Sequence, residues 1–170
     1  MNSVIFFKVK LFADDDKIYI VIDDINKCAV LQDGLDKLFE WSVIWQLNLA
    51  KDKCHILHIG KVNENFNYNV ENNALPQCKQ TVDLRVTIYH SLRLSCNIDN
   101  IVNKANARSA LILRCFKSRE PKLLLKAFDV YVRPVLEYCC QVWNPSYKCD
   151  INKIEAAQRR FTKKCVDLEI

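Results

Sequence analysis

Glycine and proline are scarce in this chain, which has two glycines and four prolines among its 170 residues. Long disordered segments are usually rich in glycine and proline and poor in apolar residues. This sequence has few of the former, and half of its residues are hydrophobic. We therefore expect regular secondary structure along most of the chain. The length predicts one domain or two small ones.

The sequence also lacks an apolar run long enough to span a membrane. The apolar run from Val4 to Phe7 is too short for a signal peptide, and Lys8 and Lys10 interrupt its surroundings. No two of the nine cysteines form a Cys-x-x-Cys pair. We therefore expect reduced, mostly buried thiols in a nuclear or cytoplasmic protein that is not secreted and has no membrane partner.

Charge of one sign does not dominate, because the formal net charge is only +5. Such a charge permits nucleic-acid binding but does not demand it. Cys54, His55 and His58 lie close together, but only Cys54 and His58 share a face of the expected strand. A structural zinc site normally needs four ligands, so a packed strand is the favoured interpretation of this cluster.

Three successive carboxylates, Asp14 to Asp16, stand between two apolar runs at Val4–Leu11 and Ile18–Ile22. Both runs are typical of strands, so the acidic residues are expected at the tip of a β-hairpin. One interpretation is an ordinary turn, which aspartate favours. The other is a Mg²⁺ site, because adjacent carboxylates repel each other unless a cation lies between them, and hard oxygen ligands suit Mg²⁺.

Phe12-Ala13-Asp14-Asp15 resembles the aromatic-x-Asp-Asp signature of reverse transcriptases. Later segments resemble, in the same order, the reverse transcriptases of non-LTR retrotransposons. These segments are Leu31-Gln32 through Asp36, Glu40-Trp41-Ser42, Trp45-Gln46-Leu47, Lys53-Cys54, His58-Ile59-Gly60, Asp83-Leu84, Lys104-Ala105-Asn106, Tyr131 to Tyr138, Val142 to Pro145 and Gln158-Arg159-Arg160. The resemblance covers nearly the whole chain, from Leu11 to Thr162.

The resemblance implies an RNA-directed DNA polymerase that uses an RNA template and a DNA primer. It implies that Asp14 and Asp15 hold Mg²⁺ and that Lys53 lies near the phosphates of the incoming nucleotide, where an ammonium group stabilises the leaving group. Leu84, Arg85 and Val86 correspond to the primer grip. Arg85 stands where the family has glycine.

The expected fold class is α+β. Residues 1–95 are expected to form a partial polymerase palm, consisting of the β-hairpin, a helix at 28–47 and short antiparallel strands, including strands at 53–60 and 82–88. Along the helix, Leu31, Leu35, Leu38, Ser42 and Trp45, with Trp41 beside them, are expected to pack against the palm sheet. Residues 96–170 are expected to form an all-helical, thumb-like region with the apolar stripe Ile98, Ile101, Val102, Ala105, Ser109, Ile112 and Phe116.

Basic residues are numerous in this helical half. The candidate nucleic-acid-binding residues are Lys104, Arg108, Arg114, Lys117, Arg159, Arg160, Lys163 and Lys164. Cations of this kind neutralise phosphates without reading sequence. The alternative is a solvated helix face, with cations favoured near a helix C-terminus by its dipole.

Several features of the family are not found in this sequence. Only eleven residues precede Phe12, so we expect an upstream polymerase segment, with its fingers and further catalytic aspartate, to be missing. Ala50, Tyr89 and Asp16 also differ from the usual residues, and the acidic pair could be Asp15–Asp16 instead of Asp14–Asp15. The expected function is therefore a fragment of an RNA-directed DNA polymerase that is inactive alone; the alternatives are a non-catalytic nucleic-acid-binding module or a decayed relic.

Overall fold

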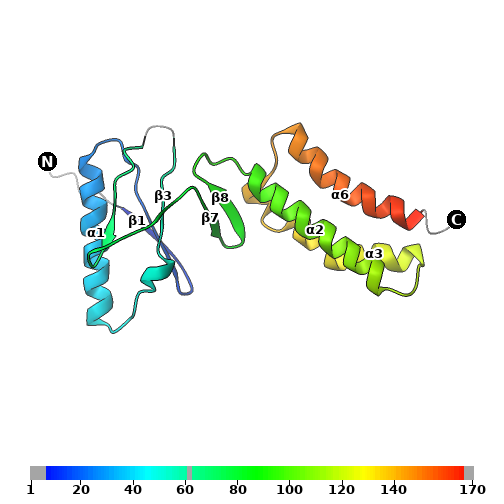
Figure 1. Ribbon diagram of the computed structural model, residues 1–170, viewed down its shortest axis with the longest axis horizontal. Helices are drawn as coiled ribbons and strands as arrows, with labels where there is room; N and C mark the ends of the chain where they lie inside the picture. The colour runs from blue at the N-terminus through cyan, green and yellow to red at the C-terminus, as the bar shows by residue number, and fades with distance from the viewer. Residues whose placement is uncertain (1–6, 61–62, 167–170) are drawn as a thin grey trace. The chain divides into compact units, whose positions relative to one another are not determined.

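Strands and one long helix occupy the chain up to Tyr89, and the described residues from Ser95 onward form only helices, which confirms the α+β class. The computed structural model describes residues 7–60 and 63–166 (Figure 1). The chain divides into two compact units, Met1–Lys79 and Gln80–Ile170. This division precedes the boundary expected near Ser95, because the hairpin before Ser95 packs with the helices: Val86 is buried in their core, and the backbone N–H of Thr87 donates to Asn97 Oδ1 at 2.9 Å.

The first unit begins with the expected hairpin. It pairs β1 (Lys8–Phe12) with β2 (Asp15–Tyr19) in antiparallel register, with Phe12 opposite Asp15. The strands are displaced from the predicted runs, since β2 begins at the second aspartate instead of at Ile18. The part of the first predicted strand before residue 7 lies outside the described residues.

The long helix α1 (Asn26–Ile44) follows the hairpin. Its best-buried side chain is Cys28, which is fully buried. Outside the helix, Tyr68 and Val70 of the same unit are also buried, with exposures of 2% and 6%. The side chain of Gln32 joins the helix to the chain beside Val70: its Nε2 donates to the Asn69 carbonyl at 2.9 Å, and its Oε1 accepts from the Asn69 N–H at 3.0 Å. A small core and one bidentate hydrogen bond thus position α1.

Trp41 and Trp45 do not pack against a sheet, as the sequence had predicted. Trp41 is 47% exposed and Trp45 is 64% exposed, and their rings contact each other at 6.3 Å between centroids. The sheets of this unit are two-stranded pairs, so its described residues contain no broad sheet surface to cover the C-terminal end of α1. The prediction that these tryptophans lie in the core is therefore wrong.

The rest of the first unit consists of short elements. They are the 3₁₀ helix η1 (Lys51–Lys53) and the strands β3 (Ile56–Leu57), β4 (Asn69–Val70), β5 (Asn73–Ala74) and β6 (Gln77–Cys78). β4 and β5 form a hairpin, whereas β3 pairs in parallel with β6. The strand predicted over 53–60 is thus limited to two residues, because its parallel partner β6 is itself only two residues long.

A second hairpin opens the other unit. The strand predicted over 82–88 is instead two strands, β7 (Gln80–Asp83) and β8 (Val86–Tyr89), joined by Leu84 and Arg85. Both turn residues have positive φ, 44° and 67°. Positive φ at both central residues is the geometry of a type I′ turn, which favours asparagine and glycine. Arg85 therefore occupies a conformation that glycine adopts more easily, and glycine is the residue found at this position in the family that the sequence resembles.

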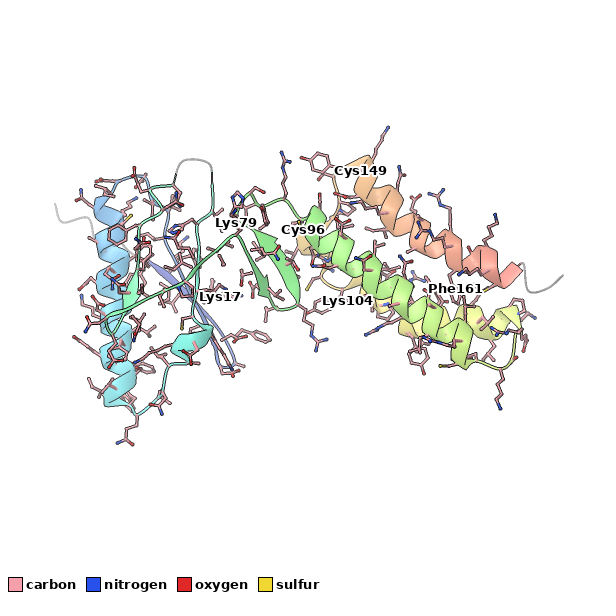
Figure 2. The ribbon with its side chains drawn as sticks, in the orientation of Figure 1. Lys17, Lys79, Cys96, Lys104, Cys149 and Phe161 are labelled. Carbon is pink, nitrogen blue, oxygen red and sulfur yellow. The ribbon has the colours of Figure 1, made fainter. Side chains whose placement is uncertain are left out.

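Five helices follow, and no strand occurs between residues 96 and 166. They are α2 (Ser95–Cys115), α3 (Pro121–Tyr131), α4 (Arg133–Glu137), α5 (Cys140–Trp143) and α6 (Lys148–Val166). Five of the seven predicted stripe positions, including Ile98, Ala105 and Ile112, are buried in α2, and Asn97 is buried in addition to them. Phe161 of α6, labelled in Figure 2, packs on Phe128 of α3 with ring centroids 4.8 Å apart. The all-helical structure expected for the second half is confirmed over residues 96–166, and the remaining four residues lie outside the described ones.

Asp150 joins the beginnings of α2 and α6. Its carboxylate is 2% exposed and accepts hydrogen bonds from Ser95 Oγ at 2.6 Å and from Lys153 Nζ at 3.2 Å. The bond from Ser95, and then the one from Lys153, keep the pKa of Asp150 below its usual value. A buried carboxylate that is paired in this way stabilises the contact between the two helices above its unfolded pKa, and this stabilisation decreases as the pH falls through the folded value.

The cysteines, all of which lie within the described residues, form no disulfide. Only Cys28 and Cys165 are buried, so the expectation of mostly buried thiols is wrong. Three others, Cys96, Cys115 and Cys149, are exposed because they fall on the outer faces of helices. Within residues 7–60 and 63–166, no helix has the length and apolar composition needed to cross a membrane.

The conformation of Arg85 yields a stability prediction. A left-handed conformation costs a non-glycine residue roughly 1–2 kcal/mol, while glycine loses about 0.5–1 kcal/mol more backbone entropy on folding. Arg85→Gly should therefore raise the stability of the second unit by about 0.5 kcal/mol, a rise in melting temperature of roughly 2–4 °C. Arg85→Ala removes the same charge but keeps the Cβ atom, and equal stabilisation by both variants in calorimetry would contradict the strain argument.

Candidate functional site

The tip of the first hairpin carries the candidate metal ligands. Ala13 and Asp14 form the two-residue turn, and Ala13 has a φ of 53°. Asp15 is opposite Phe12 and Asp16 is opposite Leu11. Successive side chains of a strand point to opposite faces, so Asp15 and Asp16 diverge. The turn thus makes Asp14 and Asp15 neighbours at the tip, and Asp16 continues along β2.

The tip is open to solvent. All three aspartates are exposed, and the neighbouring side chains of Leu11 and Phe12 are 70% and 60% exposed. In the described part of the chain, no three His, Cys, Asp or Glu side chains are grouped so that they could hold a metal ion. Asp14 and Asp15 could therefore supply only part of the ligands that Mg²⁺ requires.

Lys53 is the last residue of η1 and is exposed. Its carbonyl oxygen is 3.0 Å from Nδ1 of His55. Within the described residues, no hydrogen bond or ion pair joins its ammonium group to Asp14 or Asp15. The structure thus leaves Lys53 available at the surface of the same unit, without bringing it into contact with the aspartates.

The three residues of the predicted primer grip belong to the turn of the second hairpin. Leu84 and Arg85 are the exposed turn residues, whereas Val86 is 5% exposed and belongs to the helical core. The hydroxyl of Tyr138 donates to the Leu84 carbonyl at 3.1 Å. One buried side chain and one hydrogen bond therefore hold this turn against the helices.

The eight candidate cations fall into two groups. Arg108 donates to the carbonyl of Tyr131 at 2.9 Å, and Arg159 donates to the carboxylate of Glu155 at 2.7 Å. The others have no hydrogen bond or ion pair with any residue that the structure describes; they are Lys104, Arg114, Lys117, Arg160, Lys163 and Lys164. The second group therefore provides positive charge that the fold leaves uncompensated.

These cations do not share one face. Residues two apart on a helix are separated by about 200°. On α2, Lys104 therefore lies nearly opposite Asn106, which lines the groove between α2 and α6 that is described below. On α6, Arg160 and Lys164 form one stripe at a spacing of four, and Arg159 and Lys163 form a second stripe about 100° away. A single straight strand of nucleic acid cannot contact all eight residues.

A groove between α2 and α6 was not predicted from the sequence. It encloses about 230 Å³ and is lined by Asn106, Ser109, Ala110, Leu113, Ala157, Arg160, Phe161 and Lys164. Arg160 and Lys164 were predicted to bind nucleic acid, but Asn106 and Ser109 were not. The available signal was Ser109 itself, a hydroxyl placed within an otherwise apolar stripe.

A second groove has the opposite charge. It lies between α1 and the β4–β5 hairpin, encloses about 460 Å³, and is lined by Gln32, Asp36, Phe39, Glu40, Asn69, Glu71 and Asn72. Lys51 forms an ion pair with Glu71, and its ammonium group lies 4.9 Å from the centroid of the Phe39 ring. Its carboxylates make this groove unsuitable for a nucleic-acid backbone.

Comparisons with known proteins give a limited match. No family model matches the chain, and no solved structure matches it. A Caenorhabditis elegans protein described as uncharacterized is 30% identical to it over 82 residues, which are 48% of this chain and 41% of that protein. The match thus spans about two fifths of the relative's length. The relative's description names no activity that could be considered for this chain.

Metal titration tests the tip. Because Mg²⁺ keeps most of its water when only two carboxylates are available, calorimetry should show weak Mg²⁺ binding by the chain without nucleotide. Substoichiometric Mn²⁺ should broaden the amide resonances around Asp14 and Asp15, and Asp14→Asn should reduce this broadening.

Asp16→Asn is the matched control, since it removes the same charge from the adjacent strand position. A larger effect of Asp16→Asn would assign the ligand pair to Asp15–Asp16. Tight, stoichiometric Mg²⁺ binding without nucleotide would contradict the partial site and indicate a complete set of protein ligands.

Proposed function

We propose that this chain is a segment of an RNA-directed DNA polymerase of the non-LTR retrotransposon type, acting in the nucleus or cytoplasm. The observation that carries the proposal is the hairpin turn, where Asp14 lies in the two-residue loop and Asp15 follows it directly. The first unit is the partial palm in this proposal, and the helical unit is the thumb-like region.

The proposed roles follow from the chemistry of each side chain. Asp14 and Asp15 would hold Mg²⁺, which when bound stabilises the charge on the attacking and leaving oxygens in phosphoryl transfer. Lys53, exposed at the end of η1, would supply a positive charge or a proton to the pyrophosphate leaving group. The β7–β8 turn, with Leu84 and Arg85 at its tip, would contact the primer strand.

The helical unit supports a second candidate function, a non-catalytic module that binds nucleic acid. The observation that favours it is the set of unpaired cations on α2 and α6, which does not depend on the hairpin. Cationic side chains without carboxylate partners can displace the counterions of a phosphate backbone. Primer extension and salt-dependent binding separate this candidate from the polymerase and from a relic with no activity.

Primer extension by the purified 170-residue chain is expected to be absent. Two-metal transfer needs further ligands besides the tip carboxylates, and losing one electrostatic stabiliser typically costs 10²–10³ in rate. The measurement is extension of a labelled DNA primer on an RNA template with Mg²⁺ and nucleotides. Template-dependent extension that Asp14→Asn abolishes would contradict this expectation and show that the chain is sufficient for catalysis.

Binding of an RNA–DNA duplex should be weak, non-specific and salt-dependent. Dissociation constants should lie at about 1–100 µM at physiological salt, and log affinity should fall with log salt by roughly 0.9 per neutralised phosphate. Replacing Arg159, Arg160, Lys163 and Lys164 by alanine should flatten this slope without unfolding the chain, because the inward residues of α6, such as Phe161, are unchanged. An unchanged slope in the folded variant would show that α6 is only a solvated face.

A further inference from the structure

The groove between α2 and α6 contains a buried hydroxyl group without a hydrogen-bond partner. Ser109 is 9% exposed, and its Oγ atom is inaccessible to solvent and bonds to no group in the structure, including the backbone carbonyl one turn earlier. Leaving a hydroxyl buried and unpaired costs free energy. Ser109 also lines a groove, so a change of its χ1 rotamer would turn the hydroxyl toward a ligand bound there.

The other polar groups lining the groove are donors that also lack partners. The side-chain amide of Asn106 makes no hydrogen bond within the described residues, and it lies on α2 three positions before Ser109. Arg160 and Lys164 line the facing side, on α6, and neither forms an ion pair with a described residue. No acidic residue lines the groove. The lining therefore combines two cations, a hydroxyl and an amide.

Size and shape restrict the ligand further. Pockets for drug-sized ligands usually enclose about 300–1,000 Å³, whereas this groove encloses about 230 Å³. Ala110 and Ala157 are small, which leaves the space open, and Phe161 forms an apolar wall. A compact anion with several acceptor oxygens matches these dimensions and donors, and arginine in particular binds phosphate through two parallel hydrogen bonds.

We propose that the groove between α2 and α6 is a binding site for a single phosphate group, held by Asn106, Ser109, Arg160 and Lys164. The phosphate can belong to a nucleic-acid backbone or be free in solution. The first source rests on the proposed nucleic-acid function, whereas the phosphate site itself does not. Its existence depends on the unpaired donors of the groove, and those are independent of the hairpin and its aspartates.

The chain offers a matched control within the same helix. Arg159 and Lys163 have the spacing and charge of Arg160 and Lys164 but do not line the groove. The double variants Arg160→Gln/Lys164→Gln and Arg159→Gln/Lys163→Gln change the net charge by the same amount. A site in the groove predicts different effects for the two variants, whereas general attraction to a basic helix predicts equal effects.

The experiment is a titration of the full chain with inorganic phosphate at constant ionic strength, followed by amide NMR. Phosphate should shift the resonances of Asn106, including its side-chain amide, and of Ser109. Arg160→Gln/Lys164→Gln should weaken binding about tenfold, and Arg159→Gln/Lys163→Gln less than about twofold. Equal weakening by both variants, or no shift at Asn106 and Ser109, would overturn the proposal.

Ser109→Ala separates binding from structure. Because the hydroxyl has no partner in the fold, this variant should weaken phosphate binding about two- to tenfold without lowering the melting temperature. A large loss of stability with unchanged phosphate affinity would show that the hydroxyl serves the helix packing, which would overturn its proposed role as a phosphate ligand.

A dinucleotide with one phosphodiester distinguishes the sources of the phosphate. Binding of the dinucleotide with the same dependence on Arg160 and Lys164 would assign the groove to a nucleic-acid backbone. Phosphate binding without dinucleotide or duplex binding would keep the site and reject the nucleic-acid function. Duplex binding that is equally sensitive to both double variants would keep that function and reject the site.

Discussion

Burial of the apolar stripe of α2 is the interaction on which the second unit depends. Ile98, Ala105 and Ile112 lie on one side of the helix and pack in a core shared with α3, α4 and α6. A helix that buries one side must direct its remaining residues outward, which exposes Lys104 and Arg108. The edge of the same contact, where α2 meets α6, contains Ser109. Packing thus determines both which cations remain exposed and where the unpaired hydroxyl lies.

The first unit is held differently. Its buried residues are few, chiefly Cys28, Tyr68 and Val70, and its strands form two-stranded pairs. Isolated two-stranded hairpins are marginally stable in water, so the geometry at Asp14 depends on the local turn more than on packing. The side chain of Phe12 beside the tip is 60% exposed, so packing contributes little at this end of the hairpin. The candidate metal ligands therefore lie on the less constrained of the two units.

The spacing of apolar residues predicted the elements whose structure depends on their own sequence. It missed the features that depend on contact with a segment distant in the chain. The stripe of α2 was predictable because a spacing of three and four identifies a helical face. Trp45 has the same spacing, but its burial requires a partner surface that the helix sequence does not reveal. The turn at Leu84–Arg85 was missed because neither residue is typical of turns, and Ser109 was recognised as inward but not as lining a groove.

The hairpin turns show that contacts elsewhere in the fold can hold residues in backbone conformations that those residue types disfavour. Both glycines of the chain lie elsewhere, at Gly34 within α1 and at Gly60, yet Ala13, Leu84 and Arg85 all have positive φ. The left-handed conformation is unfavourable for these residue types, so other contacts must maintain it. At the second hairpin those contacts are the buried Val86 and the hydrogen bond from Tyr138 to Leu84. The turn thus keeps a glycine-like conformation with arginine in place, because its strands and the helices beneath it fix the path of the chain.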